Sequence, residues 1–226
     1  MSENLIYGAL GTLFVVLVWA AIQFYRQPSW ALSILLPLTA FLIFDAGVLL
    51  IGNYLGEGEL LHVLSQIRVL LRAFTFPLLI AIGFDQGKRS GSKLLADPLS
   101  ALASWIIILV LVIVGFYIEF LGLELEFKDI AGNKRYLELS TPKLHYAAIV
   151  AAALVVGLGL IVFREIKKPW LMVGAVGLLL SLLALAAGIT DLAVSYAAAI
   201  FGACVLISET QLKLPPIPEP ATTLVK

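Results

Sequence analysis

The sequence predicts an all-α membrane protein, a polytopic bundle of seven transmembrane helices with a short extracytoplasmic β-hairpin. Hydrophobic residues make up 61% of the 226 residues, and the mean hydropathy is +1.03. Charged residues make up 13%, about half the usual share of a soluble domain. A soluble core of this length cannot bury so much apolar surface. The zero net charge gives no indication of a nucleic-acid partner, and the single Cys204 excludes an intramolecular disulfide.

The predicted spans follow from runs of about 20 apolar residues, the length that crosses the hydrocarbon core as a helix. Seven such runs cover 4–25, 30–54, 60–84, 98–121, 144–163, 169–187 and 190–208. The first run lacks the basic start and small-residue cleavage site of a signal peptide, which indicates a retained helix. A seven-helix transmembrane domain is therefore expected over 1–208, followed by a proline-rich cytoplasmic tail over 209–226.

The orientation is predicted from the basic residues of the connections. Nine belong to one side: Arg26, Lys88, Arg89, Lys93, Arg164, Lys167, Lys168, Lys213 and Lys226. Four belong to the other: Lys128, Lys134, Arg135 and Lys143. The positive-inside rule then places the N-terminus outside and the C-terminus in the cytoplasm, with a prokaryotic plasma membrane expected.

The long loop over 122–143 carries the pattern of two strands. LELEF at 123–127 and RYLEL at 135–139 alternate apolar and charged residues, and Gly132-Asn133 between them is typical of a hairpin turn. We expect a two-stranded hairpin over the outer mouth of the bundle. A disordered polar loop is the alternative.

One acidic residue, Asp45, interrupts the apolar stretch LIFDAGVLL. Charges within a span face the bundle interior and usually pair. Arg68 lies at matching depth on the next antiparallel span, each residue roughly 13 Å below the outer edge. Arg72 is one turn deeper on the same helix face. The sequence therefore predicts that Asp45 pairs with Arg68, Arg72 or both.

Three further residues near the outer ends are candidates for the same site. Glu119 and Asp191 could balance the second arginine, although Glu119 could also reach water and Asp191 could cap its helix. His62 begins the third span at the same level. No metal site is expected, because the H-x-x-x-H and H-E-x-x-H spacings are absent.

The polar groups of the spans lie mainly in the outer halves, whereas the inner halves are almost purely aliphatic. Pro37 and Pro77 are expected to kink the second and third helices. These features favour a pocket that opens to the outside above a sealed cytoplasmic floor. An ion-pair network that only fixes the helix register is the alternative.

Two resemblances bear on identity. FDAGVLLIGNYLGEGELLHVLSQIRVLLRAFTFPLL resembles, over about 40 residues, a stretch of uncharacterised bacterial multi-span membrane proteins with an R-x-x-x-H-x-x-x-T-P run. Here Arg72 stands in the histidine's place and Thr75 comes one position early, and the likeness implies no activity. The topology is also similar to that of the microbial rhodopsins, but no lysine lies inside a span, which excludes a covalent retinal. No cofactor is expected.

The predicted function is the binding or transport of a small anion or lipid head group by an outward-facing polar site of Asp45, Arg68 and Arg72. Planar guanidinium groups suit carboxylate and phosphate. An accessory or structural subunit of a larger membrane complex is the first alternative. A lipid-modifying enzyme with Asp45 or His62 as base is the second; no catalytic residue is assigned, because the sequence lacks a nucleophile elbow and a metal-ligand run. The expected partners are membrane lipid, a small anionic ligand or a membrane complex.

Overall fold

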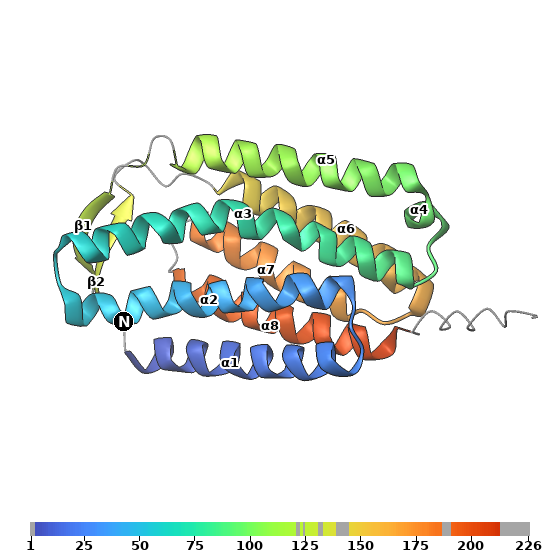
Figure 1. The fold of residues 1–226 in the computed structure, drawn as a ribbon, viewed down its shortest axis with the longest axis horizontal. Helices are drawn as coiled ribbons and strands as arrows, with labels where there is room; N and C mark the ends of the chain where they lie inside the picture. Colours follow the sequence, from blue (N-terminus) through green and yellow to red (C-terminus); the bar gives the residue numbers. More distant parts are fainter. Residues whose placement is uncertain are drawn as a thin grey trace, which may run out of the picture.

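A computed structural model of the chain describes residues 3–120, 123, 125–130, 133–138, 145–186 and 191–212. Long helices lie side by side along one axis, and two strands lie at one end (Figure 1). The helices are α1 (Glu3–Arg26), α2 (Trp30–Leu55), α3 (Glu59–Arg89), α4 (Lys93–Ala96), α5 (Pro98–Gly115), the π-helical η1 (Phe116–Phe120), α6 (Tyr146–Ile166), α7 (Trp170–Ala186) and α8 (Asp191–Gln211). The strands are β1 (Leu125–Ile130) and β2 (Asn133–Glu138).

Six helices of the described chain are long and apolar enough to cross a membrane: α1, α2, α3, α5, α6 and α8. Helix α7 is apolar but has 17 residues, which extend about 26 Å at 1.5 Å per residue. The hydrocarbon core is about 30 Å thick. The structure is therefore compatible with a polytopic membrane protein, and a seventh crossing by α7 stays a prediction.

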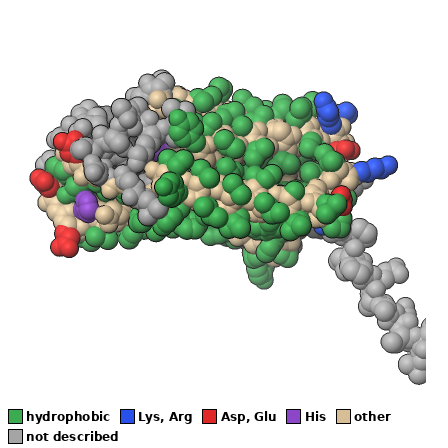
Figure 2. Space-filling model, turned by 90° about the horizontal axis from the view of Figure 1, so that it is seen from above, with side chains coloured by type: hydrophobic (Ala, Val, Ile, Leu, Met, Phe, Trp, Pro, Cys, Tyr) green, Lys and Arg blue, Asp and Glu red, His purple; other side chains and the backbone are tan. Residues whose placement is uncertain are grey.

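The outer surface of the bundle is apolar between two polar ends. Large side chains such as Phe14, Leu109 and Ile113 are exposed along it. Figure 2 shows a broad hydrophobic zone, with lysines and arginines gathered at one end beside a few acidic side chains, and with acidic side chains and histidine at the other. We name these the basic end, where α1 and α3 finish, and the hairpin end, where β1 and β2 lie. An apolar girdle between polar ends is the surface that a bilayer requires.

Helix α3 holds the bundle together, because it contacts α2, α5 and α6. Helix α1 packs against α2 and α8, and α6, α7 and α8 pack in sequence order. Glycine permits the closest of these approaches. A Cβ atom on Gly159 would lie 2.7 Å from the Cα of Met172, and one on Gly174 would lie 3.1 Å from the Cα of Phe201. Small residues commonly permit such backbone approach between membrane helices.

Both predicted kink positions lie inside continuous helices, Pro37 in α2 and Pro77 in α3. Each proline removes a backbone N–H from the helical ladder. The structure assigns helix on both sides of each proline, so the kinks themselves stay a prediction.

The two strands pair antiparallel, with Phe127 opposite Tyr136. The ring centroid of Tyr136 lies 5.4 Å from that of Phe127 and 5.1 Å from that of His62 on α3, both in T-shaped arrangements. His62 is therefore a packing partner of the strand pair. The strands begin and end up to three residues away from the predicted bounds, and the innermost pair, Ile130 with Asn133, encloses positions 131 and 132, outside the described residues.

The basic end is expected to face the cytoplasm, which cysteine labelling can measure. In a Cys204→Ser background, a membrane-impermeant maleimide should label Glu57→Cys in intact cells and should label Lys93→Cys only after permeabilisation. Both positions are exposed, at opposite ends of α3 and its connections. The reverse pattern would contradict the orientation.

The close approach of α6 and α7 predicts that Gly159→Ala destabilises the bundle. The added methyl group would overlap the backbone at Met172, and overpacking of this kind typically costs about 1–3 kcal/mol. Thermal unfolding in detergent measures the loss. The matched control is Gly157→Ala on the same helix, where a Cβ atom meets nothing within 4 Å; equal losses for the two variants would contradict the packing argument.

Candidate functional site

The predicted ion pair is confirmed, and it uses both arginines. Arg68 donates from Nε to Asp45 Oδ1 at 2.6 Å. Arg72 donates from Nε to Oδ1 at 3.1 Å and from Nη2 to Oδ2 at 3.0 Å. Asp45 is 3% exposed and Arg68 6%. We name these three residues the Asp45 network.

The turn between α2 and α3 brings the three side chains to one level. Gly56 ends α2 with a φ of 66° and donates its N–H to the carbonyl of Gly52. A positive φ is readily adopted by glycine, which allows the chain to reverse tightly. Asp45 precedes Gly56 by nearly as many residues as Arg68 follows it. The two helices therefore run back antiparallel with these side chains at matching depth.

Two other predicted site residues, Glu119 and Asp191, belong to described helices, but their side chains are outside the described part of the structure. Glu119 belongs to η1, which contacts α3. Asp191 is the first residue of α8. Balancing of charge by Glu119 or Asp191, and capping by Asp191, stay predictions.

A second buried network lies at the basic end, where the sequence predicts a sealed cytoplasmic floor. Glu209 of α8 is 7% exposed and Gln86 of α3 is fully buried. Glu209 Oε1 accepts hydrogen bonds from Gln86 Nε2 at 2.9 Å and from Arg89 Nη2, and Oε2 accepts one from Ser29 Oγ at 3.1 Å. Arg89 also donates from Nε to Asp85 Oδ2 at 2.9 Å. We name these five residues the Glu209 network.

The Glu209 network also holds the start of α2. Ser29 caps that helix, because its Oγ accepts the N–H of Leu32. Asp85 Oδ2 accepts the N–H of Ala31 at 3.2 Å. Unpaired N–H groups and the helix dipole make a helix start favourable for carboxylates. Helices α2, α3 and α8 are thus joined at one point.

This network was not predicted from the sequence, because the apolar runs that define the spans end at 84 and 208. The helices continue to Arg89 and Gln211, so residues assigned to loops are buried side chains of helices. The inner halves of the predicted spans are almost purely aliphatic, and the polar side chains of this network lie on the helical turns beyond the predicted span ends. Asp85 and Arg89 are four residues apart, the spacing of an ion pair along one helix face, and that spacing was the available signal.

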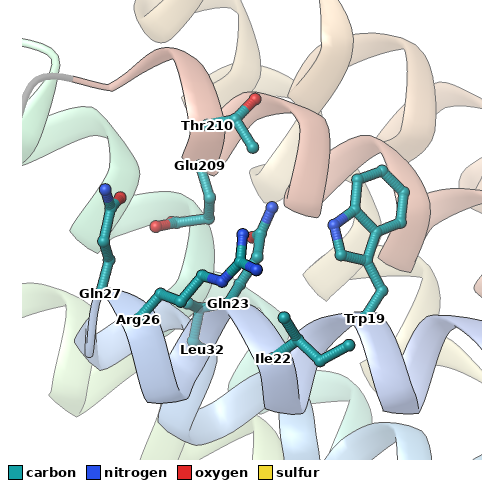
Figure 3. A pocket seen from close by; sticks show the side chains of 8 residues that line it. All are labelled: Trp19, Ile22, Gln23, Arg26, Gln27, Leu32, Glu209 and Thr210. Atoms are coloured by element: carbon teal, nitrogen blue, oxygen red, sulfur yellow. The ribbon is translucent and has the colours of Figure 1, made fainter.

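A cleft of about 300 Å³ opens beside Glu209 at the basic end. Its lining consists of Trp19, Ile22, Gln23, Arg26, Gln27, Leu32, Glu209 and Thr210 (Figure 3). In Figure 3, Arg26 and Gln23 extend from α1 into the space in front of Glu209, and Trp19 turns its indole nitrogen toward the same space. The cleft therefore lies between the end of α1 and the end of α8.

The polar groups of the cleft differ in how well they are satisfied. Gln23 Nε2 donates to the carbonyl of Leu206 at 3.3 Å, whereas Gln23 Oε1 is buried and has no partner in the described part of the chain. Arg26 is exposed and has no acidic partner among the described residues. A free cation and a free acceptor thus stand beside a fixed carboxylate.

An apolar layer separates the two networks. Leu38, Leu42, Thr75, Phe76, Leu79, Leu178, Ala198 and Phe201 surround a space of about 10 Å³, which is about the room that one water needs. The hydroxyl of Thr75 is used within α3, where it donates to the carbonyl of Leu71. The layer is therefore lined by side chains that offer a polar solute little to bind.

The paired state of Asp45 predicts coupled effects of mutation. Asp45→Ala should destabilise the protein by about 3–5 kcal/mol, because it leaves buried arginines without their carboxylate. Adding Arg68→Met should recover part of that loss, since one uncompensated charge is removed. Chemical unfolding of the single and double variants measures the coupling, and strictly additive losses would contradict the pair.

The Glu209 network predicts a large loss for Glu209→Ala, again of about 3–5 kcal/mol, since Arg89 then keeps only Asp85 as an acidic partner. The matched control is Glu165→Ala at the same end, an exposed residue, with an expected change within about 0.5 kcal/mol. Thermal unfolding of both variants gives the comparison. Similar small changes in both would show that the network contributes little to stability.

A scan against protein-family models, a search of curated proteins and a search of solved structures found no match to this chain. Family membership therefore gives no function. The two networks and the cleft of about 300 Å³ are the features from which a function follows.

Proposed function

We propose that the chain is an integral membrane protein that binds a small anionic group, a free anion or a lipid head group, in the cleft beside Glu209. One observation carries the proposal: Arg26 stands at the cleft, exposed and without an acidic partner among the described residues. The planar guanidinium group can donate two parallel hydrogen bonds to two oxygens of a carboxylate or a phosphate.

The rear of the cleft is held rigidly, which favours binding. The Glu209 side chain accepts bonds from Gln86, Arg89 and Ser29, so it is fixed before any ligand arrives. Only the side chains at the mouth of the cleft would then lose conformational entropy when a ligand binds, which lowers the free-energy cost of binding. A concave site with a few convergent polar groups is typical of small-molecule binding.

The Asp45 network supports a second location for the same class of ligand, the outward-facing site predicted from the sequence. Arg72 is its more accessible arginine, with 15% of the side chain exposed against 7% for Arg68. Asp45 already accepts three hydrogen bonds there, which favours the alternative of a network that fixes helix register. Transport between the two ends would require the apolar layer to open.

The orientation belongs to the same proposal. The excess of basic residues at one end (Figure 2) supports an orientation with the basic end in the cytoplasm and the hairpin end outside. This orientation includes α7 as a seventh crossing. An accessory subunit of a membrane complex is the alternative function. Co-purification of a stoichiometric partner from native membranes in mild detergent would favour it.

The proposal predicts that phosphate-bearing probes stabilise the purified protein through Arg26. Inorganic phosphate or a short-chain phosphatidic acid should raise the thermal midpoint in detergent; a probe at 100 times its Kd adds about 2.7 kcal/mol. Arg26→Gln should abolish the effect. Arg164→Gln, an exposed arginine near the end of α6, should leave it unchanged.

The same measurement discriminates between the two locations. Loss of the effect in Arg72→Gln but not in Arg26→Gln would move the site to the Asp45 network. Stabilisation that survives both substitutions, or no stabilisation by either probe, would refute the proposal.

A further inference from the structure

An apolar groove continues from the cleft along the membrane-facing side of α1 and α8. Its volume is about 340 Å³. The lining includes Gly11, Val15 and Trp19 of α1 and Ala199, Ile200 and Ala203 of α8. Trp19 lines both the groove and the cleft, so the two adjoin at this side chain, and we call them together the depression.

The depression changes character with depth. Arg26 is the last residue of α1, and at 1.5 Å per residue Trp19 lies about 10 Å and Gly11 about 22 Å farther along the helix. The polar part is therefore at the level of head groups, and the apolar part is at the level of acyl chains. An amphipathic molecule from the bilayer itself matches that division.

We infer that the cleft and groove together hold one phospholipid whose head group carries a primary ammonium. The inference rests on the proposed function and names its ligand. The lipid phosphate lies against Arg26, and the ammonium donates to Gln23 Oε1 and the Glu209 carboxylate. One acyl chain lies in the groove over Gly11.

Charge complementarity selects the ammonium. The Glu209 network has two carboxylates, Asp85 and Glu209, against the single guanidinium of Arg89. Gln23, which lines the cleft, has a buried acceptor, Oε1, without a partner in the described part of the chain. A primary ammonium supplies both the positive charge and N–H donors. A trimethylammonium has no N–H, and a glycerol head group has no positive charge.

Two lipids with identical acyl chains test the head group: phosphatidylethanolamine and phosphatidylcholine, which differ only by N-methylation. Native mass spectrometry of the full chain released from mixed micelles should retain one phosphatidylethanolamine per protein. Phosphatidylcholine should bind at least roughly tenfold more weakly, the factor expected from losing hydrogen bonds to a charged group. Gln23→Met should remove much of this discrimination.

A matched pair of glycines tests the groove. Gly11 on α1 and Gly157 on α6 are both exposed, and a Cβ atom on either meets nothing within 4 Å. Gly11→Leu should fill the groove and weaken retention of phosphatidylethanolamine at least roughly tenfold, the factor expected when about two methylene groups of the acyl chain lose their apolar contact. Gly157→Leu adds the same side chain elsewhere and should leave retention unchanged.

The outcomes separate this inference from the proposal on which it rests. Equal retention of the two lipids would overturn the recognition of the ammonium group. The proposed function would still be supported if phosphate stabilised the wild-type protein but not Arg26→Gln. If Gly11→Leu retained phosphatidylethanolamine as well as the wild-type protein does, the placement of an acyl chain in the groove would be overturned. Retention that no variant alters would show ordinary annular lipid and overturn the inference entirely.

Discussion

The need to pair every buried charge within an apolar bundle determines how the central helices fit together. Helix α3 supplies Arg68 and Arg72 at one level, and Asp85, Gln86 and Arg89 at another. Helix α2 contacts α3 at both levels: Asp45 pairs with the arginines at the first, and the N–H of Ala31 donates to Asp85 at the second. The α2–α3 pair is thus fixed at two points, and α8 is joined to it by Glu209. Sliding or rotating any of these helices would strand a charge in a medium that solvates it poorly.

The sequence was informative where charge or hydropathy has a single interpretation. Asp45 and Arg68 each lie deep inside an apolar run, where an unpaired charge has a high desolvation free energy. Pairing was therefore expected, and the structure contains that pair. The helices likewise lie where the apolar runs predicted them. Glu209 was missed because a polar residue at the end of an apolar run reads equally as loop or as buried helix. Only the tertiary packing of α8 on α2 and α1 decides between the two. A cleft formed by two helices at opposite ends of the chain has no local signal at all.

Helix α1 plays a different part from α3. Among the described elements its main contacts are with α2 and α8. Its outer side lines the groove, where Gly11 of α1 and Ala203 of α8 leave room. Its last turn brings Arg26 to the rim of a cleft whose rear wall belongs to α8. The charge-paired helices at the centre form the scaffold, and the more accessible α1 at the edge carries the proposed binding surface.

The order in which the chain is synthesised gives the Asp85–Arg89 pair a role of its own. Asp45 and Arg68 are separated by 23 residues, so Arg68 of α3 can neutralise the charge of Asp45 on α2 soon after α3 is synthesised. Arg89 and Glu209 are separated by 120 residues, so α8 appears long after α3. Asp85, one turn before Arg89, is a partner that is present from the moment α3 forms. The nascent bundle can therefore remain in the bilayer with its arginine neutralised until α8 arrives.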